Sequence, residues 1–293
     1  MSTAPNVAQR IGSAPEFLEY MALAEAENRP SSSAPTNVDP SVAQRDDPLD
    51  GGLVVERRLG RGSTADVLLV RREADGEQLV LKVAIDEIHG DRLRDEAELI
   101  ASLHHQNIVH VVDTITVSGR TAMLMEWAGE QTLASLIHSP TALSLDLVRR
   151  YGDELLHAVD YLEQKGVAHR DIKPDNIGIG AVGGSGRKRL VLFDFSLGRT
   201  PPENIQAGTR PYLDPFLSTR RPPRWDLHAE RYAVAVTLNE MLTGATPVWG
   251  DGLSDPAATE DEAQIGSERF EPSLRDGLVA LHRGFDELIR AGA

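Results

Sequence analysis

The chain has 293 residues, of which 41% are hydrophobic, and its formal net charge at pH 7 is -15. This length allows one large domain or two lobes with a buried core. The acidic balance argues against a general nucleic-acid-binding surface, and the absence of cysteine excludes disulfides and thiolate chemistry. No apolar run approaches the roughly 20 residues of a membrane span, and the N-terminus lacks the pattern of a signal peptide. We therefore expect a cytoplasmic protein without direct nucleic-acid or membrane partners.

Residues 1–50 are rich in Ala, Pro, Ser and Asp, a composition that buries too little apolar surface to offset the entropy of ordering. We predict a mostly disordered leader here. Within it, residues 14–28 carry apolar side chains at helical spacing. This segment is interpreted either as a helix that docks on another protein or on the rest of the chain, or as a nascent helix without a partner.

Residues 51–293 are predicted to form one domain of strands followed by helices. Alternating apolar residues predict strands, in order, at 53–73 (interrupted by a glycine turn), 78–86, 108–117 and 120–129, and a hairpin at 177–195. Apolar residues repeating every three or four positions predict helices at 91–104, 132–138, 145–164, 230–244 and 272–290.

The richest segment chemically is His169-Arg170-Asp171-Ile172-Lys173-Pro174-Asp175-Asn176. Pro174 cannot donate a backbone hydrogen bond, so we predict a rigid loop. Phosphoryl transfer needs a carboxylate near the attacking hydroxyl, positive charge on the transferred group and oxygen ligands for Mg²⁺. Asp171, Lys173 and Asn176 can supply these three parts.

This loop resembles the catalytic loop of eukaryotic-type protein kinases, and the position of Lys173 resembles that of the serine/threonine branch. Other segments follow in the order of that family. In that family, a glycine loop precedes a strand that carries the residue covering the adenine of ATP. A later strand leads to backbone groups that would bind the edge of the adenine. The resemblance implies nucleotide contacts at Gly60, Gly62, Ala65, Val67, Met125, Glu126 and Ala128, with Ala65 in place of the third glycine.

Lys82 lies in an apolar strand, where a lysine taken alone would be interpreted as a surface or edge residue. In this order of motifs it resembles the lysine that holds the α- and β-phosphates. Its expected partner lies on the following helix. The spacing to Asn107-Ile108-Val109 favours Glu96 over Glu98.

Two segments depart from the pattern of the family. Asp194-Phe195-Ser196 stands where the family has D-F-G, so the resemblance gives Asp194 and Asn176 as Mg²⁺ ligands. Ser196 replaces a glycine that often uses torsions open only to glycine, which predicts restricted movement. Asp214-Pro215-Phe216 replaces A-P-E, whose glutamate pairs with an arginine near the end of the C-lobe, and no such arginine segment is evident.

Three further positions carry expectations from the same resemblance. Glu230 stands where an aspartate anchors the backbone of the catalytic loop, and another carboxylate can do the same. Gly178 stands where a bulkier residue usually lies under the adenine, which predicts a roomier pocket floor. Arg170 could bind a phosphorylated residue, with Ser196 and Thr200 nearby, but we expect control by a partner or by the leader.

The resemblance implies an α+β, bilobal protein kinase-like fold. The N-lobe (about 51–127) is expected to be a small antiparallel sheet with one main helix, and the C-lobe (about 128–293) to be mostly helical and shortened at its end. The implied function is transfer of the γ-phosphoryl group of ATP, with Mg²⁺, to Ser or Thr of protein substrates including the chain itself. The alternatives are a pseudokinase that binds nucleotide as a regulatory scaffold, a small-molecule phosphotransferase and a non-catalytic interaction module.

A narrower resemblance rests on two phrases, RPYLDPFL at 210–217 and AERYAVAVTLNEMLTG at 229–244. Both are similar to the kinases of phage growth limitation and related phage-defence systems. The resemblance implies partner proteins of a defence system, and a chain that is a fragment or a shortened relative of larger kinases.

Overall fold

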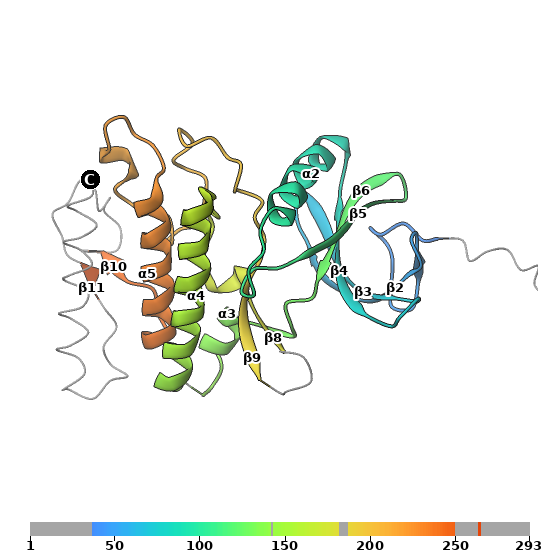
Figure 1. Ribbon diagram of the computed structural model, residues 1–293, viewed down its shortest axis with the longest axis horizontal. Helices are drawn as coiled ribbons and strands as arrows, with labels where there is room; N and C mark the ends of the chain where they lie inside the picture. The colour runs from blue at the N-terminus through green and yellow to red at the C-terminus, as the bar shows by residue number, and fades with distance from the viewer. Residues whose placement is uncertain (1–36, 142, 182–186, 250–262, 265–293) are drawn as a thin grey trace, which may run out of the picture.

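The computed structural model describes residues 37–141, 143–181, 187–249 and 263–264. Figure 1 shows strands β2 to β6 with helix α2 in one lobe, and helices α3, α4 and α5 with strands β8 and β9 in the other. The segments predicted as helices at 14–28 and 272–290 lie outside the described residues. In the part of the chain that is described, no helix is both long and apolar enough to cross a membrane.

The N-lobe is an antiparallel sheet in the order β1-β2-β3-β4-β6-β5. Its strands are Pro48–Leu49 (β1), Leu53–Arg61 (β2), Ala65–Arg72 (β3), Gln78–Ala84 (β4), Val111–Val117 (β5) and Arg120–Glu126 (β6). Ser118 and Gly119 join β5 to β6, and both have the positive φ that a two-residue hairpin turn requires. In the middle of the sheet, the register sets Lys82 opposite Val67 on β3 and Met123 on β6.

Helix α2 (Glu87–Ala101) begins four residues before the predicted start at 91. The reason is a cap: the Asp86 carboxylate accepts a hydrogen bond from the His89 backbone N–H at 2.9 Å, which satisfies a donor that the first turn would leave free. Leu93, Ala97 and Ile100 form the buried face, as their spacing predicts.

In the C-lobe, α4 (Leu145–Lys165) and α5 (Leu227–Thr243) lie side by side (Figure 1). Each ends at a glycine in the left-handed conformation, Gly166 and Gly244, as is typical of helix C-termini. The smaller elements are β7 (Gln131–Thr132), α3 (Leu133–Ile137), the 3₁₀ turns Pro174–Asn176 (η2) and Leu217–Thr219 (η3), β8 (Ile177–Ala181), β9 (Lys188–Leu192), β10 (Val248–Trp249) and β11 (Ala263–Gln264). β7, β8 and β9 form one sheet, whose central strand β8 directly follows the catalytic loop, and β10 pairs with β11.

The main hydrophobic core runs through both lobes. Ile100 of α2 and Met123 of β6 belong to it from the N-lobe, and Leu155 of α4 and Ile172 of the catalytic loop belong to it from the C-lobe. Phe195 is 1% exposed, and its ring centroid lies 4.5 Å from that of His169. Because this core is continuous, the packing that holds α2 extends to the catalytic loop at Ile172.

A second core covers the outer face of the N-lobe sheet, and it moves the boundary predicted for the leader. We expected residues up to about 50 to be mostly disordered, but residues 37–50 are ordered against β2. Ala43 and Leu49 are buried in this core, and β1 pairs with β2. The physical reason is that the outer face of the sheet is itself apolar, so a few apolar side chains in a polar segment suffice to cover it.

Candidate active site

Lys82 on β4 reaches two carboxylates at once. Its Nζ lies 2.9 Å from both Oε atoms of Glu96 on α2 and 2.9 Å from Oδ1 of Asp194. Burial lowers the pKa of Lys82, but the charges of Glu96 and Asp194 raise it more, so the pKa lies above its ordinary value and the lysine stays charged. The glutamate that contacts Lys82 is thus Glu96. Glu98 is exposed, and its Oε2 lies 3.6 Å from Arg199 Nη2.

The catalytic-loop side chains form a second cluster. Oδ2 of Asp171 accepts hydrogen bonds from Lys173 Nζ at 2.7 Å and from Asn176 Nδ2 at 3.0 Å. Lys173 also donates to Thr209 Oγ1 at 2.7 Å, so the threonine reaches Asp171 through the lysine. Oδ1 of Asp171 is buried without a hydrogen-bond partner within the described residues. An unpaired buried oxygen is costly unless another group binds it, and a substrate hydroxyl suits this position.

The backbone of the catalytic loop is held by Glu230 at the start of α5. Its two carboxylate oxygens accept the backbone N–H groups of His169 at 2.6 Å and of Arg170 at 3.0 Å. Burial raises the pKa of Glu230 to about 7, although the two N–H donors oppose the shift. The glutamate thus makes the contact expected at this position. His169 further fixes the loop because its Nε2 lies 2.9 Å from the Phe193 carbonyl oxygen.

Arg170 is bound by backbone carbonyls of residues 197–216, which the resemblance to protein kinases gives as the activation segment. Its guanidinium donates to the carbonyl oxygens of Thr200, of Pro201 at 3.0 Å and of Asn204 at 2.9 Å. Its Cζ also lies 5.1 Å from the ring centroid of Trp225, within the range of a cation–π contact. Arg170 therefore holds the segment without a phosphate group.

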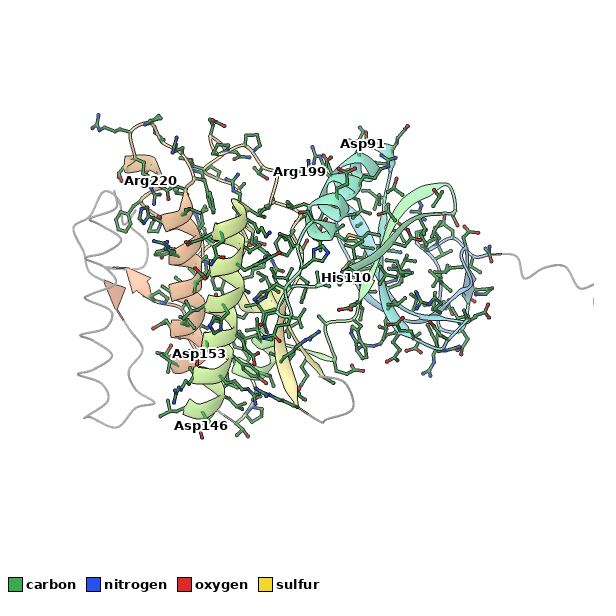
Figure 2. All side chains as sticks on the ribbon, in the orientation of Figure 1. Asp91, His110, Asp146, Asp153, Arg199 and Arg220 are labelled. Carbon is green, nitrogen blue, oxygen red and sulfur yellow. The ribbon has the colours of Figure 1, made fainter. Side chains whose placement is uncertain are left out.

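The end of the activation segment is fixed by a buried ion-pair triad that the sequence analysis missed. Arg220 Nη2 lies 2.8 Å from Asp214 Oδ2, and Arg220 Nε lies 2.8 Å from Asp226 Oδ2. Asp226 caps α5 by accepting the N–H of His228, so Arg220 lies at the N-terminal end of that helix (Figure 2). Asp214, which stands at the position of the alanine of A-P-E, thus pairs with an arginine six residues further along the chain. The only sequence signal was that Arg220 lies six residues after Asp214 in the chain.

The residues predicted to contact the nucleotide lie on β2, β3 and β6 or just after β2 and β6. Gly60 and Arg61 end β2, Ala65 begins β3, and Val67 is paired with both Gly60 and Lys82 across the sheet. Met125 is buried at the end of β6. The Glu126 N–H donates to the His110 carbonyl oxygen at 2.9 Å, which leaves the carbonyl group as the part of the Glu126 backbone that would bind an adenine.

At Gly178, a neighbouring residue occupies the place where a side chain would lie. A Cβ built on Gly178 would lie 2.5 Å from the Ala128 Cβ and 2.7 Å from its carbonyl oxygen. Ala128 therefore fills the space that the missing side chain leaves, and the glycine is needed for this close approach of two backbones.

Ser196 needs no glycine torsion. Within the described residues, the non-glycine positive φ values in the catalytic loop and in the Asp194-Phe195-Ser196 segment are at Arg170 (69°) and Asp194 (66°). The replacement of glycine at Ser196 is therefore free of backbone strain. Burial raises the pKa of Asp194, but the charge and hydrogen bond of Lys82 lower it more, helped by a Ser196 hydrogen bond, so the net pKa is below its ordinary value.

The residues present fit a magnesium ion bound with ATP. Asp194 is an ionised carboxylate, and Asn176 uses its amide nitrogen toward Asp171, which leaves the amide oxygen to serve as a ligand. Mg²⁺ is commonly held by one or two carboxylates plus substrate phosphates. In the described part of the chain, no cluster of three or more His, Cys, Asp or Glu side chains suited to a metal occurs.

These features define a protein kinase domain, and comparison with known proteins gives the same class. The protein kinase domain family matches residues 53–274, and the chain belongs to this family. It is 38% identical to "Probable kinase PglW" of Streptomyces coelicolor over 96% of this chain and 21% of that protein. It is 31% identical to "Probable serine/threonine-protein kinase PknB" of Bifidobacterium longum, over 66% of this chain and 30% of that protein.

A solved structure supports the fold. The kinase domain of Mycobacterium tuberculosis PknI superposes with a TM-score of 0.52 at 25% identity, covering 70% of this chain and 78% of that one. The bilobal α+β fold and the resemblance to bacterial kinases, including those of phage growth limitation, are thus confirmed. The chain spans about a fifth of the length of PglW.

Proposed function

We propose that the chain is an ATP-dependent serine/threonine protein kinase. The observation that carries the proposal is the position of Lys82, whose ammonium group joins Glu96 and Asp194 at 2.9 Å. This arrangement aligns the lysine that would hold the phosphates with the carboxylate that would ligate the metal. A scaffold that had lost catalysis would not need to retain it together with Asp171.

The roles follow from the contacts. Asp171 accepts the proton of the attacking Ser or Thr hydroxyl, for which its unpaired Oδ1 is suited. Lys173 neutralises charge on the transferred group and is held by Thr209. Asp194 and Asn176 would bind Mg²⁺, which would neutralise charge on the phosphates when present.

The test is incubation of the purified chain with Mg²⁺ and γ-labelled ATP, followed by mapping of phosphorylated residues. Label on Ser or Thr in the native chain, lost in Lys82→Ala and Asp171→Asn, supports the kinase and its autophosphorylation. Asp171→Asn should retain ATP binding because the residue acts on the hydroxyl. Nucleotide binding without any transfer in the native chain would favour the pseudokinase instead.

We further propose a role in bacterial phage defence, with partner proteins of a defence system. The support is the 38% identity to PglW along nearly the whole chain. Bacteria that express the native protein in its natural gene setting would be challenged with phage beside the Asp171→Asn variant. Equal plaque formation on both strains would contradict a defence role for the kinase activity.

A further inference from the structure

The segment Asp39–Ala43, which we call the strap, forms a tight turn on the outer face of the N-lobe sheet. The Ser41 N–H donates to Asp39 Oδ1 at 2.7 Å, and the N–H groups of Val42 and Ala43 donate to the Asp39 carbonyl oxygen at 3.0 Å. Ala43 is 6% exposed and belongs to the outer core. The turn is thus held internally by Asp39 and anchored to the sheet by Ala43.

Two arginines of β2 bind the backbone of the strap. Arg58 Nη2 donates to the carbonyl oxygens of Pro40 at 2.7 Å and Ser41 at 3.2 Å. Arg61 Nη2 donates to the same Ser41 carbonyl oxygen. Since Arg61 lies between Gly60 and Gly62, the strap is joined directly to the glycine loop.

Asp66 at the start of β3 completes the connection. Its Oδ1 lies 2.7 Å from Arg58 Nη1 and 3.0 Å from Arg61 Nε, and the residue is only 3% exposed. A buried carboxylate requires such partners. One carboxylate therefore orients both arginines toward the strap.

These contacts lie on the face of the sheet opposite to the nucleotide. Val67 is paired with Lys82 across the sheet, and its neighbour Asp66 points to the other face because side chains alternate along a strand. The strap can thus hold the loop from outside and leave the phosphate face free.

We propose that Asp39, Arg58, Arg61 and Asp66 are positioning residues that fix the glycine loop over ATP through the strap. Glycines leave a loop conformationally free, and ordering such a loop on binding weakens affinity. A loop already held by the strap avoids this loss. The inference rests on the proposed kinase function and adds that the segment before the kinase sheet sets the affinity for ATP.

The test uses the full chain with Asp39→Ala, Arg61→Ala and the double variant. Both side chains are about half exposed (51% and 58%), so the variants should fold. The matched control is Arg45→Ala, just beyond the strap, whose side chain is 82% exposed. Hydrogen exchange of residues 60–66 is measured without nucleotide, and KM for ATP and kcat are measured in the kinase assay.

We expect each single variant to speed exchange of the loop amides and to raise KM for ATP about fivefold, with kcat within about twofold. The double variant should match the single ones because Asp39 holds the turn that presents the Ser41 carbonyl oxygen to Arg61, so that either substitution breaks the same link. Unchanged exchange and unchanged KM in both variants would overturn the inference. Faster exchange in the variants, with no phosphate transfer by the native chain, would support the contact between the strap and the glycine loop. It would contradict only the proposed kinase function.

Discussion

Arg220 and Asp214 form a salt bridge of 2.8 Å in which the side chains are 6% and 0% exposed. Together with Asp226, the pair ties the end of the activation segment to the N-terminus of α5. One turn into that helix, Glu230 holds the backbone of the catalytic loop. Through α5, the triad thus links the end of the activation segment to the catalytic loop that carries Asp171.

Arg220→Ala should lower the free energy of unfolding by about 3 to 5 kcal/mol because Asp214 would remain as a buried, unpaired charge. The measurement is urea denaturation followed by fluorescence. Arg221→Ala is the matched control, since this neighbouring arginine is exposed. Equal stability of the two variants would show that the buried pair does not hold the fold.

Glu96→Gln should lower kcat/KM for ATP by about 10² because Lys82 loses a charged partner and its fixed position. Glu98→Gln, two residues along the same helix, should leave the value unchanged because that side chain is 72% exposed. Steady-state kinetics over a range of ATP concentrations distinguish the two. Comparable losses in both variants would contradict the role assigned to Glu96.

Thr200→Val should retain full activity because Arg170 binds the carbonyl of Thr200, which the substitution preserves. Thr209→Val should reduce kcat by about 10 to 10² because a hydrogen bond to the charged Lys173 is worth ~1.5 to 3 kcal/mol. The kcat of both variants is measured with γ-labelled ATP, and the phosphorylated residues are mapped in parallel. Stoichiometric phosphate on Thr200, required for activity, would contradict this expectation.

Glu230 predicts a pH dependence of stability. Its folded pKa of about 7 lies above the ordinary value of 4.5, so the folded state binds this proton more tightly. The contribution of this group is present below about pH 4.5 and is lost as the pH rises through about 7. The stability of the native chain relative to Glu230→Gln should therefore fall between pH 5 and pH 8. Urea denaturation of both proteins at each pH measures the difference, and a rise would refute the assignment.

The sequence by itself determined the class of protein and most of the site. Asp171, Lys173 and Asn176 could be predicted as site residues because phosphoryl transfer requires a few side-chain types at short, fixed spacings. Helix ends were equally readable where glycine followed an apolar repeat, as at Gly166. Glu96 could be favoured over Glu98 from its spacing to Asn107-Ile108-Val109, which resembles that of the kinase family.

Only the tertiary structure decided the contacts between residues that no short-range pattern connects. Arg220 lies among several arginines, and burial against Asp214 and Asp226 singles it out. The polar composition of residues 37–50 predicted disorder, yet the apolar outer face of the sheet orders them through Ala43 and Leu49. At Gly178, sequence indicated a vacant space that the backbone of Ala128 fills. In each case, the neighbour in space sets the free energy of a side chain, and only folding brings that neighbour into contact.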